Sequence, residues 1–177
     1  LTKSMTTTAP SVWKFGYGSN ISPAFLREKK QLTVLDWRRC ILRGFSLSFP
    51  EGRGISYVEP AFATLRRDPD GEVHGTACLF PSADALKLDR QEQSYNVESC
   101  KVQLYSAAGA AGEEEISGVE VYTAKRPEPE GFPQGCCSER YKNILVAGAV
   151  EMELEPAWIQ RLRSLQVYTP SSETMEQ

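Results

Sequence analysis

An apolar segment, a turn between glycines and a short helix follow one another near the start of the chain, and this succession constrains the fold most. Residues 12–18 are VWKFGYG, which is typical of a buried strand that ends in a glycine turn. Ser22 and Pro23 then suit the N-cap and the first turn of a helix. Such a turn points backbone N–H groups, together with the side chains of Ser19 and Asn20, toward one spot. The sequence therefore predicts a site for a carboxylate or an oxyanion at this turn.

A simpler interpretation of the same residues is an ordinary tight turn in which Gly18 adopts a positive φ. The segment is too short for the G-x-G-x-x-G fingerprint of dinucleotide sites, and it lacks the lysine of a phosphate-binding P-loop. A binding role for the turn therefore needs a second element elsewhere in the chain.

Further segments have the alternation or the β-branched content of strands. They are residues 37–50, two runs within 61–81, residues 96–106 and residues 116–125. The turn sequence DPDG at 68–71 predicts a hairpin between the two runs. Glu113–Glu115 are expected at the solvated tip of the loop before the last strand.

Helical patterns occupy the remaining parts of the chain. Ser82 is the predicted N-cap of a helix that ends near Glu92. Residues 138–166 carry two helical patterns, which are separated near Gly148 and Pro156. The mixture of strands and helices predicts a mixed α/β domain of the α+β class.

Length and composition indicate one domain of a soluble protein. The chain has 177 residues, of which 41% are hydrophobic, and this supplies one core. We expect a single domain over residues 12–169 between flexible tails at 1–11 and 170–177. No apolar run approaches the roughly 18 residues of a spanning helix, and no apolar signal core opens the chain, so a cytoplasmic protein without membrane contacts is expected. A net charge of −3 with mixed signs argues against a nucleic-acid partner.

The cysteines and the single histidine form no recognisable site in the sequence. The five cysteines are scattered without a CxxC pair, at Cys40, Cys78, Cys100, Cys136 and Cys137. We therefore expect neither a zinc site nor a disulfide framework, and no metal or nucleotide cofactor. His74 lies within an expected strand and is predicted to be structural. The adjacent pair Cys136–Cys137 is expected to be incidental, with redox-sensitive thiols as the alternative.

Three segments, in this order and at these distances, resemble the γ-glutamylcyclotransferase family. They are FGYGSN at 15–20, LDRQE at 88–92 followed by Tyr95, and RYKNILVAGA at 140–149. In that family a YGSN-type loop binds the substrate, the glutamate that closes an LDxxE motif is the catalytic base, and a later tyrosine before a lysine lies beside the pocket. The resemblance extends from about Val12 to about Leu165.

The resemblance implies both a fold and a set of site residues. The implied fold is a small mixed sheet or partly closed barrel, with helices packed outside and the pocket at one end. The implied catalytic residue is Glu92, and the implied substrate-binding residues are Tyr17, Gly18, Ser19, Asn20 and Tyr141.

Several neighbouring residues keep simpler interpretations. Tyr141 is either a pocket hydroxyl or a packing tyrosine, whereas Tyr95 and Tyr122 are expected to pack. Gln93 and Ser94 depart from the family, whose members often carry one or two glycines after the glutamate. This departure leaves the preference among γ-glutamyl substrates open.

The implied reaction is intramolecular, because the substrate's own α-amino group attacks its γ-carbonyl and forms 5-oxoproline. The protein then supplies a base, an anion site and a folded substrate rather than a nucleophile. Glu92 would accept the proton and return one to the leaving amine, whereas Asp89 is given a structural role. The partner is a γ-glutamyl amino acid or amine. Glutathione, a γ-glutamyl-protected biosynthetic intermediate, a catalytically silent anion-binding module and a homodimer all remain open.

Overall fold

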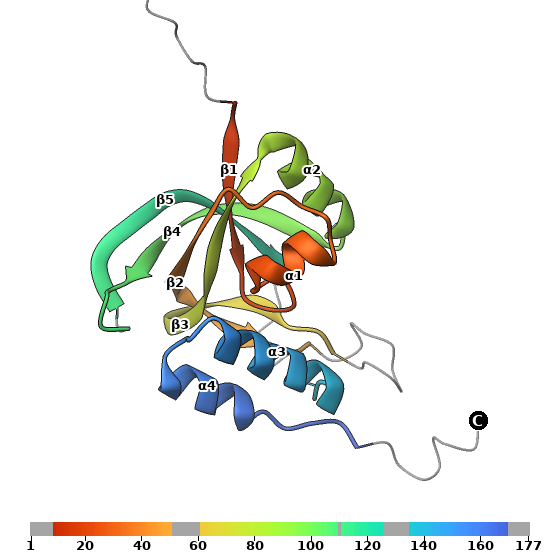
Figure 1. Cartoon of the computed structure of the whole chain (residues 1–177). Helices are drawn as coiled ribbons and strands as arrows, with labels where there is room; N and C mark the ends of the chain where they lie inside the picture. The colour runs from red at the N-terminus through yellow and green to blue at the C-terminus, as the bar shows by residue number, and fades with distance from the viewer. Residues whose placement is uncertain (1–8, 51–60, 110, 126–134, 170–177) are drawn as a thin grey trace, which may run out of the picture.

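The centre of the molecule is a closed five-stranded barrel, shown in Figure 1. The computed structural model describes residues 9–50, 61–109, 111–125 and 135–169. The strands are β1 (Ser11–Gly16), β2 (Asp36–Ser48), β3 (Thr64–Pro81), β4 (Tyr95–Tyr105) and β5 (Ala111–Ala124). They follow the order β1-β3-β2-β4-β5, and the parallel pair β1/β5 closes an otherwise antiparallel barrel. The predicted mixed fold, with a small barrel at its centre, is confirmed.

Four helices pack around the barrel in two groups. They are α1 (Pro23–Glu28), α2 (Ser82–Gln91), α3 (Glu139–Glu151) and α4 (Pro156–Arg163). Figure 1 shows α1 and α2 on one side of the barrel, while α3 and α4 lie side by side below it. Among the described residues, no helix combines the length and the apolar character needed to cross a bilayer.

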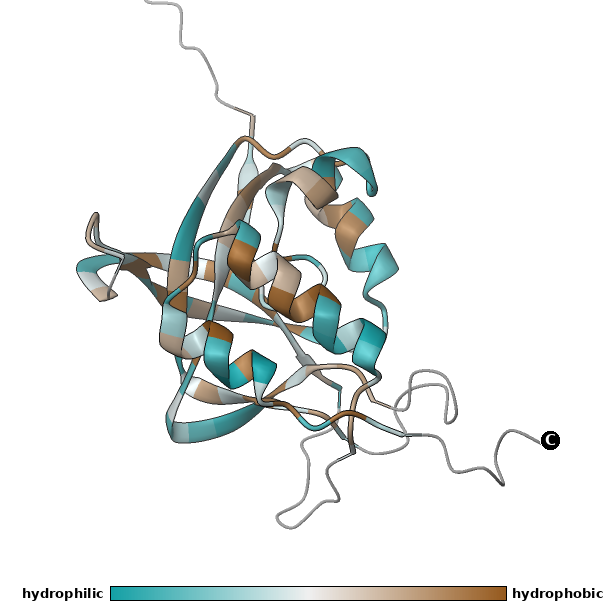
Figure 2. Ribbon diagram, turned by 60° about the horizontal axis from the view of Figure 1, so that its bottom comes forward, coloured by the Kyte–Doolittle hydropathy of each residue, from teal (hydrophilic) through white to brown (hydrophobic). Residues whose placement is uncertain are grey.

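Two hydrophobic clusters hold these layers together. The larger cluster fills the barrel and continues under α3 and α4, and its buried residues include Phe15 and Leu145. The smaller cluster lies under α1 and α2 and includes Leu26, Phe80 and Leu88. Figure 2 shows hydrophobic and hydrophilic residues alternating along the helices, as expected for helices with one face on a core. Because α2 carries Glu92 at its end, the smaller cluster fixes the direction from which this residue approaches the barrel.

The hairpin predicted at DPDG is wrong, because β3 continues through this segment as one strand. Both halves of β3 pair with β2, through Phe45↔Arg67 on one side and Arg43↔Glu72 on the other. Residues 68–71 thus lie opposite Gly44 alone, which adopts a φ of +83°. The extra residues form an irregularity within the β2/β3 ladder rather than a reversal of the chain.

The start of α2 also differs from its prediction. Ser82 is the first residue of the helix rather than its cap, and Pro81 occupies the N-cap position without a side-chain hydrogen bond. Ser82 Oγ instead donates to the carbonyl of Pro10 at 2.9 Å. The cap predicted for α1 is confirmed, because Ser22 Oγ accepts from the backbone N–H of Phe25 at 3.2 Å.

Two further element boundaries differ from their predictions. Glu113–Glu115 lie within β5 rather than at a loop tip, where Glu115 pairs with Gln103 of β4. Gly148 lies inside α3 rather than at its end, and α3 and α4 are separated at residues 152–155. Most of the predicted N-terminal tail, and the whole of the C-terminal one, lie outside the described residues.

Candidate active site

The turn between β1 and α1 is held tightly against its surroundings. A hydrogen bond of 3.2 Å from the N–H of Ile21 to the carbonyl of Gly18 closes it. The hydroxyl of Thr76 donates to the Ile21 carbonyl at 2.6 Å. A Cβ atom at Gly16 would lie only 2.3 Å from the carbonyl oxygen of Asn20, so the chain can fold back here only with glycine. This close approach fixes the positions of the residues that follow.

The predicted positive φ at Gly18 is wrong. The glycines with positive φ among the described residues are Gly44, Gly109 and Gly118. A Cβ atom at Gly18 would instead lie 3.3 Å from the hydroxyl oxygen of Tyr141. Gly18 therefore matters for the space it leaves in front of Tyr141 rather than for its backbone conformation.

The turn, the end of α2 and several aromatic residues line one pocket of about 370 Å³, including its opening to solvent. Its lining residues are Phe15, Gly16, Tyr17, Gly18, Ser19, Asn20, Ala63, Glu92, Tyr95, Tyr122 and Tyr141. The structure thus brings together all six residues that the family resemblance implied. It also adds Tyr95 and Tyr122, which were expected only to pack.

Glu92 follows the last residue of α2, and its backbone N–H still donates to the carbonyl of Leu88 at 3.1 Å. Its side chain is 19% exposed. The Oε1 atom accepts from Asn20 Nδ2 at 2.9 Å and from Lys30 Nζ at 3.3 Å. The Oε2 atom has no hydrogen-bond partner in the part of the chain that the structure describes. The carboxylate is therefore held by one oxygen, and the other remains available to a ligand.

Three hydroxyl groups of the pocket are tied to the barrel backbone. Tyr17 donates to the carbonyl of Tyr122 at 3.0 Å, and the hydroxyl of Tyr141 accepts from the N–H of Ala63 at 3.3 Å. Tyr95 donates to the Ala63 carbonyl at 3.4 Å. Burial raises the pKa of Tyr17, Tyr122 and Tyr141 above the ordinary value of 10.0, so these side chains stay neutral.

Glu92 is the one charged side chain among the lining residues that the structure describes. The backbone N–H groups of Gly18 and Ser19 donate to no acceptor within the described residues. The pocket thus combines one carboxylate, neutral hydroxyl groups and free amide donors. This combination suits a zwitterionic ligand whose cation lies near Glu92 and whose anion lies near the turn.

Sequence reasoning missed two lysines that contact the acidic end of α2. Lys30 contacts Glu92, and Lys14 of β1 donates to Asp89 Oδ1 at 2.7 Å. The partners are 62 and 75 positions apart in the sequence, so no local spacing could have indicated these pairs. Asp89 also accepts from the hydroxyl of Tyr122 at 2.7 Å, and these contacts agree with the structural role predicted for it.

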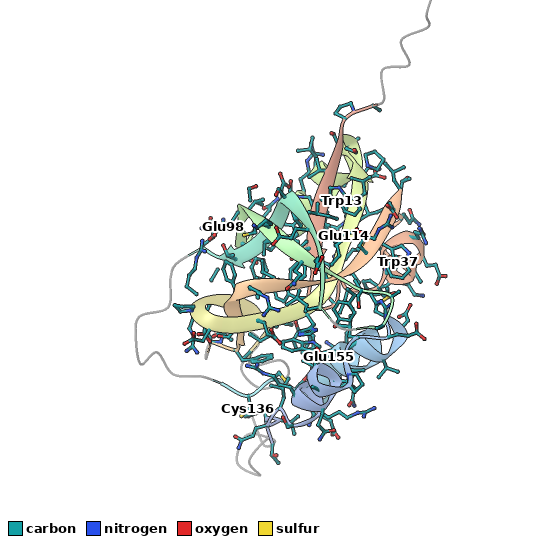
Figure 3. The ribbon with its side chains drawn as sticks, turned by 90° about the vertical axis from the view of Figure 1, so that its left-hand side faces the viewer. Trp13, Trp37, Glu98, Glu114, Cys136 and Glu155 are labelled. Atoms are coloured by element: carbon teal, nitrogen blue, oxygen red, sulfur yellow. The ribbon has the colours of Figure 1, made fainter. Side chains whose placement is uncertain are left out.

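His74, Cys136 and Cys137 do not line the pocket. His74 is buried beside the hydroxyl of Tyr105 and stacks on Trp158 of α4, with ring centres 5.1 Å apart. Burial raises the pKa of Tyr105 to about 12. Figure 3 labels Glu155, which lies near His74 between α3 and α4. It also labels Cys136, which lies in the segment before α3. The structural role predicted for His74 agrees with these contacts.

Comparison with curated proteins gives one informative match. The chain is 25% identical to the γ-glutamyl cyclotransferase aclK of Aspergillus oryzae, over 93% of this chain and 65% of that protein. The chain therefore spans about 65% of the length of this relative. No family model matches the chain.

Solved structures share the fold. An uncharacterized protein, LOC79017 from Homo sapiens, is 24% identical with a TM-score of 0.69, over 94% of this chain and 96% of that chain. A γ-glutamyl cyclotransferase is 23% identical with a TM-score of 0.71, over 94% and 97% of the two chains. The chain thus has the γ-glutamyl cyclotransferase-like fold, and it resembles a curated γ-glutamyl cyclotransferase in sequence along nearly its whole length.

Proposed function

We propose that this chain is a γ-glutamyl cyclotransferase, which converts a γ-glutamyl amino acid or amine to 5-oxoproline and the free amine. One observation carries the proposal: the carboxylate of Glu92 and the turn residues Tyr17, Gly18, Ser19 and Asn20 line the same pocket. The match to a curated γ-glutamyl cyclotransferase supports the same reaction.

In the proposed reaction the α-ammonium group of the substrate first gives a proton to Glu92. The resulting amine attacks the γ-carbonyl carbon, a new C–N bond closes the five-membered ring, and a tetrahedral oxyanion forms. The original amide C–N bond then breaks while Glu92 returns this proton to the departing nitrogen. The ring nitrogen gives up its second proton, through Glu92, to the released amine, which leaves as an ammonium ion. Atoms and charges balance without a nucleophile, a metal or an oxidant from the protein.

The geometry of Glu92 suits this exchange of a proton. Asn20 and Lys30 hold Oε1, so Oε2 is the oxygen that we assign to the substrate's ammonium group. The free N–H groups of Gly18 and Ser19 would bind the substrate carboxylate or the oxyanion. The neutral hydroxyl groups of Tyr17 and Tyr141 leave the charge balance of the pocket unchanged.

Glutathione is a second candidate substrate. A structural neighbour with a TM-score of 0.59 and 16% identity is a γ-glutamyl cyclotransferase specific to glutathione, from yeast. Glutathione carries the same γ-glutamyl bond, with a larger leaving amine. Because Gln93 and Ser94 depart from the family pattern, glutathione and a γ-glutamyl-protected biosynthetic intermediate both remain open as substrates.

A product assay tests the proposal. The purified protein is incubated separately with γ-glutamyl-alanine, glutathione and γ-glutamyl-lysine, and 5-oxoproline is quantified by mass spectrometry. We expect product from at least one substrate, and kcat/KM ranks the three. Absence of product from all of them would contradict the proposal and favour a catalytically silent binding module.

A further inference from the structure

The C-terminal end of α2 carries two carboxylates, Asp89 and Glu92, and each contacts a different lysine. Negative charge is unfavourable at this end of a helix, where the backbone carbonyls already give a negative potential. Lys30 pairs with Glu92, and Lys14 pairs with Asp89. Since Asp89 lies one helical turn before Glu92, whatever holds Asp89 also limits where Glu92 can lie.

Lys14 is a buried cation that the proposed reaction does not use. Its side chain is 2% exposed, and its ammonium group contacts Asp89 at 2.7 Å and also pairs with Glu120. The same ammonium lies 5.2 Å from the ring centre of Tyr122, whose hydroxyl donates to Asp89 at 2.7 Å. Lys14 thus joins β1, β5 and α2 behind the wall of the pocket. A buried lysine needs such partners, because an unpaired buried charge is strongly unfavourable.

A small hollow connects this group with Asn20. Lys14, Asn20, Leu88 and Tyr122 are among its lining residues, and it has room for about one water molecule. Asn20 Oδ1 is buried and has no hydrogen-bond partner among the described residues, whereas Nδ2 donates to Glu92. The reverse amide orientation would place two oxygens in contact, so Oδ1 faces away from Glu92.

We propose that Lys14 is a positioning residue for Glu92. It holds Asp89, and with it the last turn of α2, against the barrel. The carboxylate of Glu92 is thereby kept in the geometry that the substrate's ammonium group requires. This inference rests on the proposed function for its kinetic consequence, but not for its structural one.

The test is Lys14→Met, which keeps the apolar stem and removes the ammonium group. We expect kcat to fall by about 10- to 100-fold, because a small displacement of a catalytic group costs this much. KM should change less than about threefold, since Lys14 does not line the pocket. Crystal structures of the wild type and the variant should show that the contact between Asn20 and Glu92 is lost. A purely structural lysine would lower the melting temperature and leave kcat per folded molecule unchanged.

Lys87→Met is the matched control, because it removes a lysine that belongs to α2, the helix that Lys14 contacts. Lys87 is 58% exposed and pairs with Asp84 at the opposite end of α2. Its removal should leave kcat within about twofold of the wild type. If Lys14→Met does not fold, the double variant Lys14→Met, Glu120→Gln replaces it, because it keeps the net charge of the buried group.

The outcomes separate this inference from the proposed function. Normal kcat in Lys14→Met, with Glu92 still bonded to Asn20, would overturn the positioning role and leave the function intact. A wild type without any 5-oxoproline product would overturn the function. In that case the crystal structures alone decide, and a displaced Glu92 supports the positioning role, while an unmoved one overturns it.

Discussion

At the scale of single residues, Glu92 concentrates the proposed chemistry in one carboxylate. Glu92→Gln keeps the size of the side chain, but it removes the proton acceptor. We expect kcat to fall about 10²- to 10⁴-fold, which corresponds to about 3 to 5.5 kcal/mol in the barrier, while circular dichroism stays unchanged. Asp89→Asn should cost less, since Asp89 does not line the pocket.

Glu115→Gln serves as the control for this experiment. Glu115 is 47% exposed and pairs with Lys101 on the outside of the barrel. The control should keep normal turnover, because exposed pairs contribute little. Turnover close to that of the wild type in a well-folded Glu92→Gln protein would remove the assigned base.

Gly18 is the second residue whose role in the pocket can be tested. In Gly18→Val the added carbons would point toward the hydroxyl of Tyr141, which lies 3.3 Å from an ideal Cβ atom. Because φ at Gly18 is not positive, the backbone tolerates the substitution. We therefore expect weaker substrate binding rather than a less stable fold. We expect KM to rise about tenfold or more, with a melting temperature within a few degrees of the wild type.

Gly16→Ala provides the contrast to this variant. Its Cβ atom would lie 2.3 Å from the carbonyl oxygen of Asn20, so we expect a large loss of stability. Full activity in Gly18→Val would return the turn to a role in folding alone.

At the scale of elements, the first turn of α2 is fixed by a charged contact. Asp84 accepts from the backbone N–H of Thr33 at 2.8 Å and pairs with Lys87 at 2.7 Å. The Lys87 and Thr33 hydrogen bonds lower the pKa of Asp84 from its ordinary value of 3.8. A carboxylate whose pKa is lowered in the folded state stabilises that state above its unfolded pKa and loses the effect as the pH falls.

Asp84→Asn should therefore destabilise the protein at neutral pH, by about 1 to 2 kcal/mol. The difference in melting temperature between the wild type and the variant should shrink as the pH falls below about 4. Thermal unfolding at pH 7 and pH 3 measures both values. A difference that is equal at both pH values would show that the charge of Asp84 does not contribute.

The sequence predicted local features of the helices and strands better than it predicted which distant segments contact one another. Ser22 and Pro23 indicated α1 because capping depends on residues three positions apart. The hairpin prediction at DPDG was wrong because a turn sequence also fits an irregularity in a strand ladder, here opposite Gly44. Lys14 and Lys30 escaped prediction because their acidic partners are brought near only by the closed barrel. The six residues implied by the resemblance meet in one pocket, whereas the groups that hold Glu92 from behind come from the structure alone.

At the scale of the whole molecule, the proposed reaction needs only the protein and its substrate. We expect the formation of 5-oxoproline to be unaffected by EDTA at a large excess over trace metal. We also expect it to require no nucleotide. The measurement compares initial rates before and after dialysis against the chelator. Loss of activity that zinc or magnesium restores would mean that the mechanism has been assigned incorrectly.

The parallel pair β1/β5 also bears on how the protein reaches its native state. Lys14↔Glu120 and Phe15↔Val121 join residues that are 106 positions apart in the sequence, and this closure brings Tyr122 to the turn that follows β1. Contacts between such distant segments form late, because a long loop must first be closed. The pocket is therefore completed together with the barrel, and partly folded chains or fragments that lack β5 would lack the part of the pocket wall that Tyr122 contributes. Recovery of catalysis during refolding thus reports the final closure step rather than the early collapse of the chain.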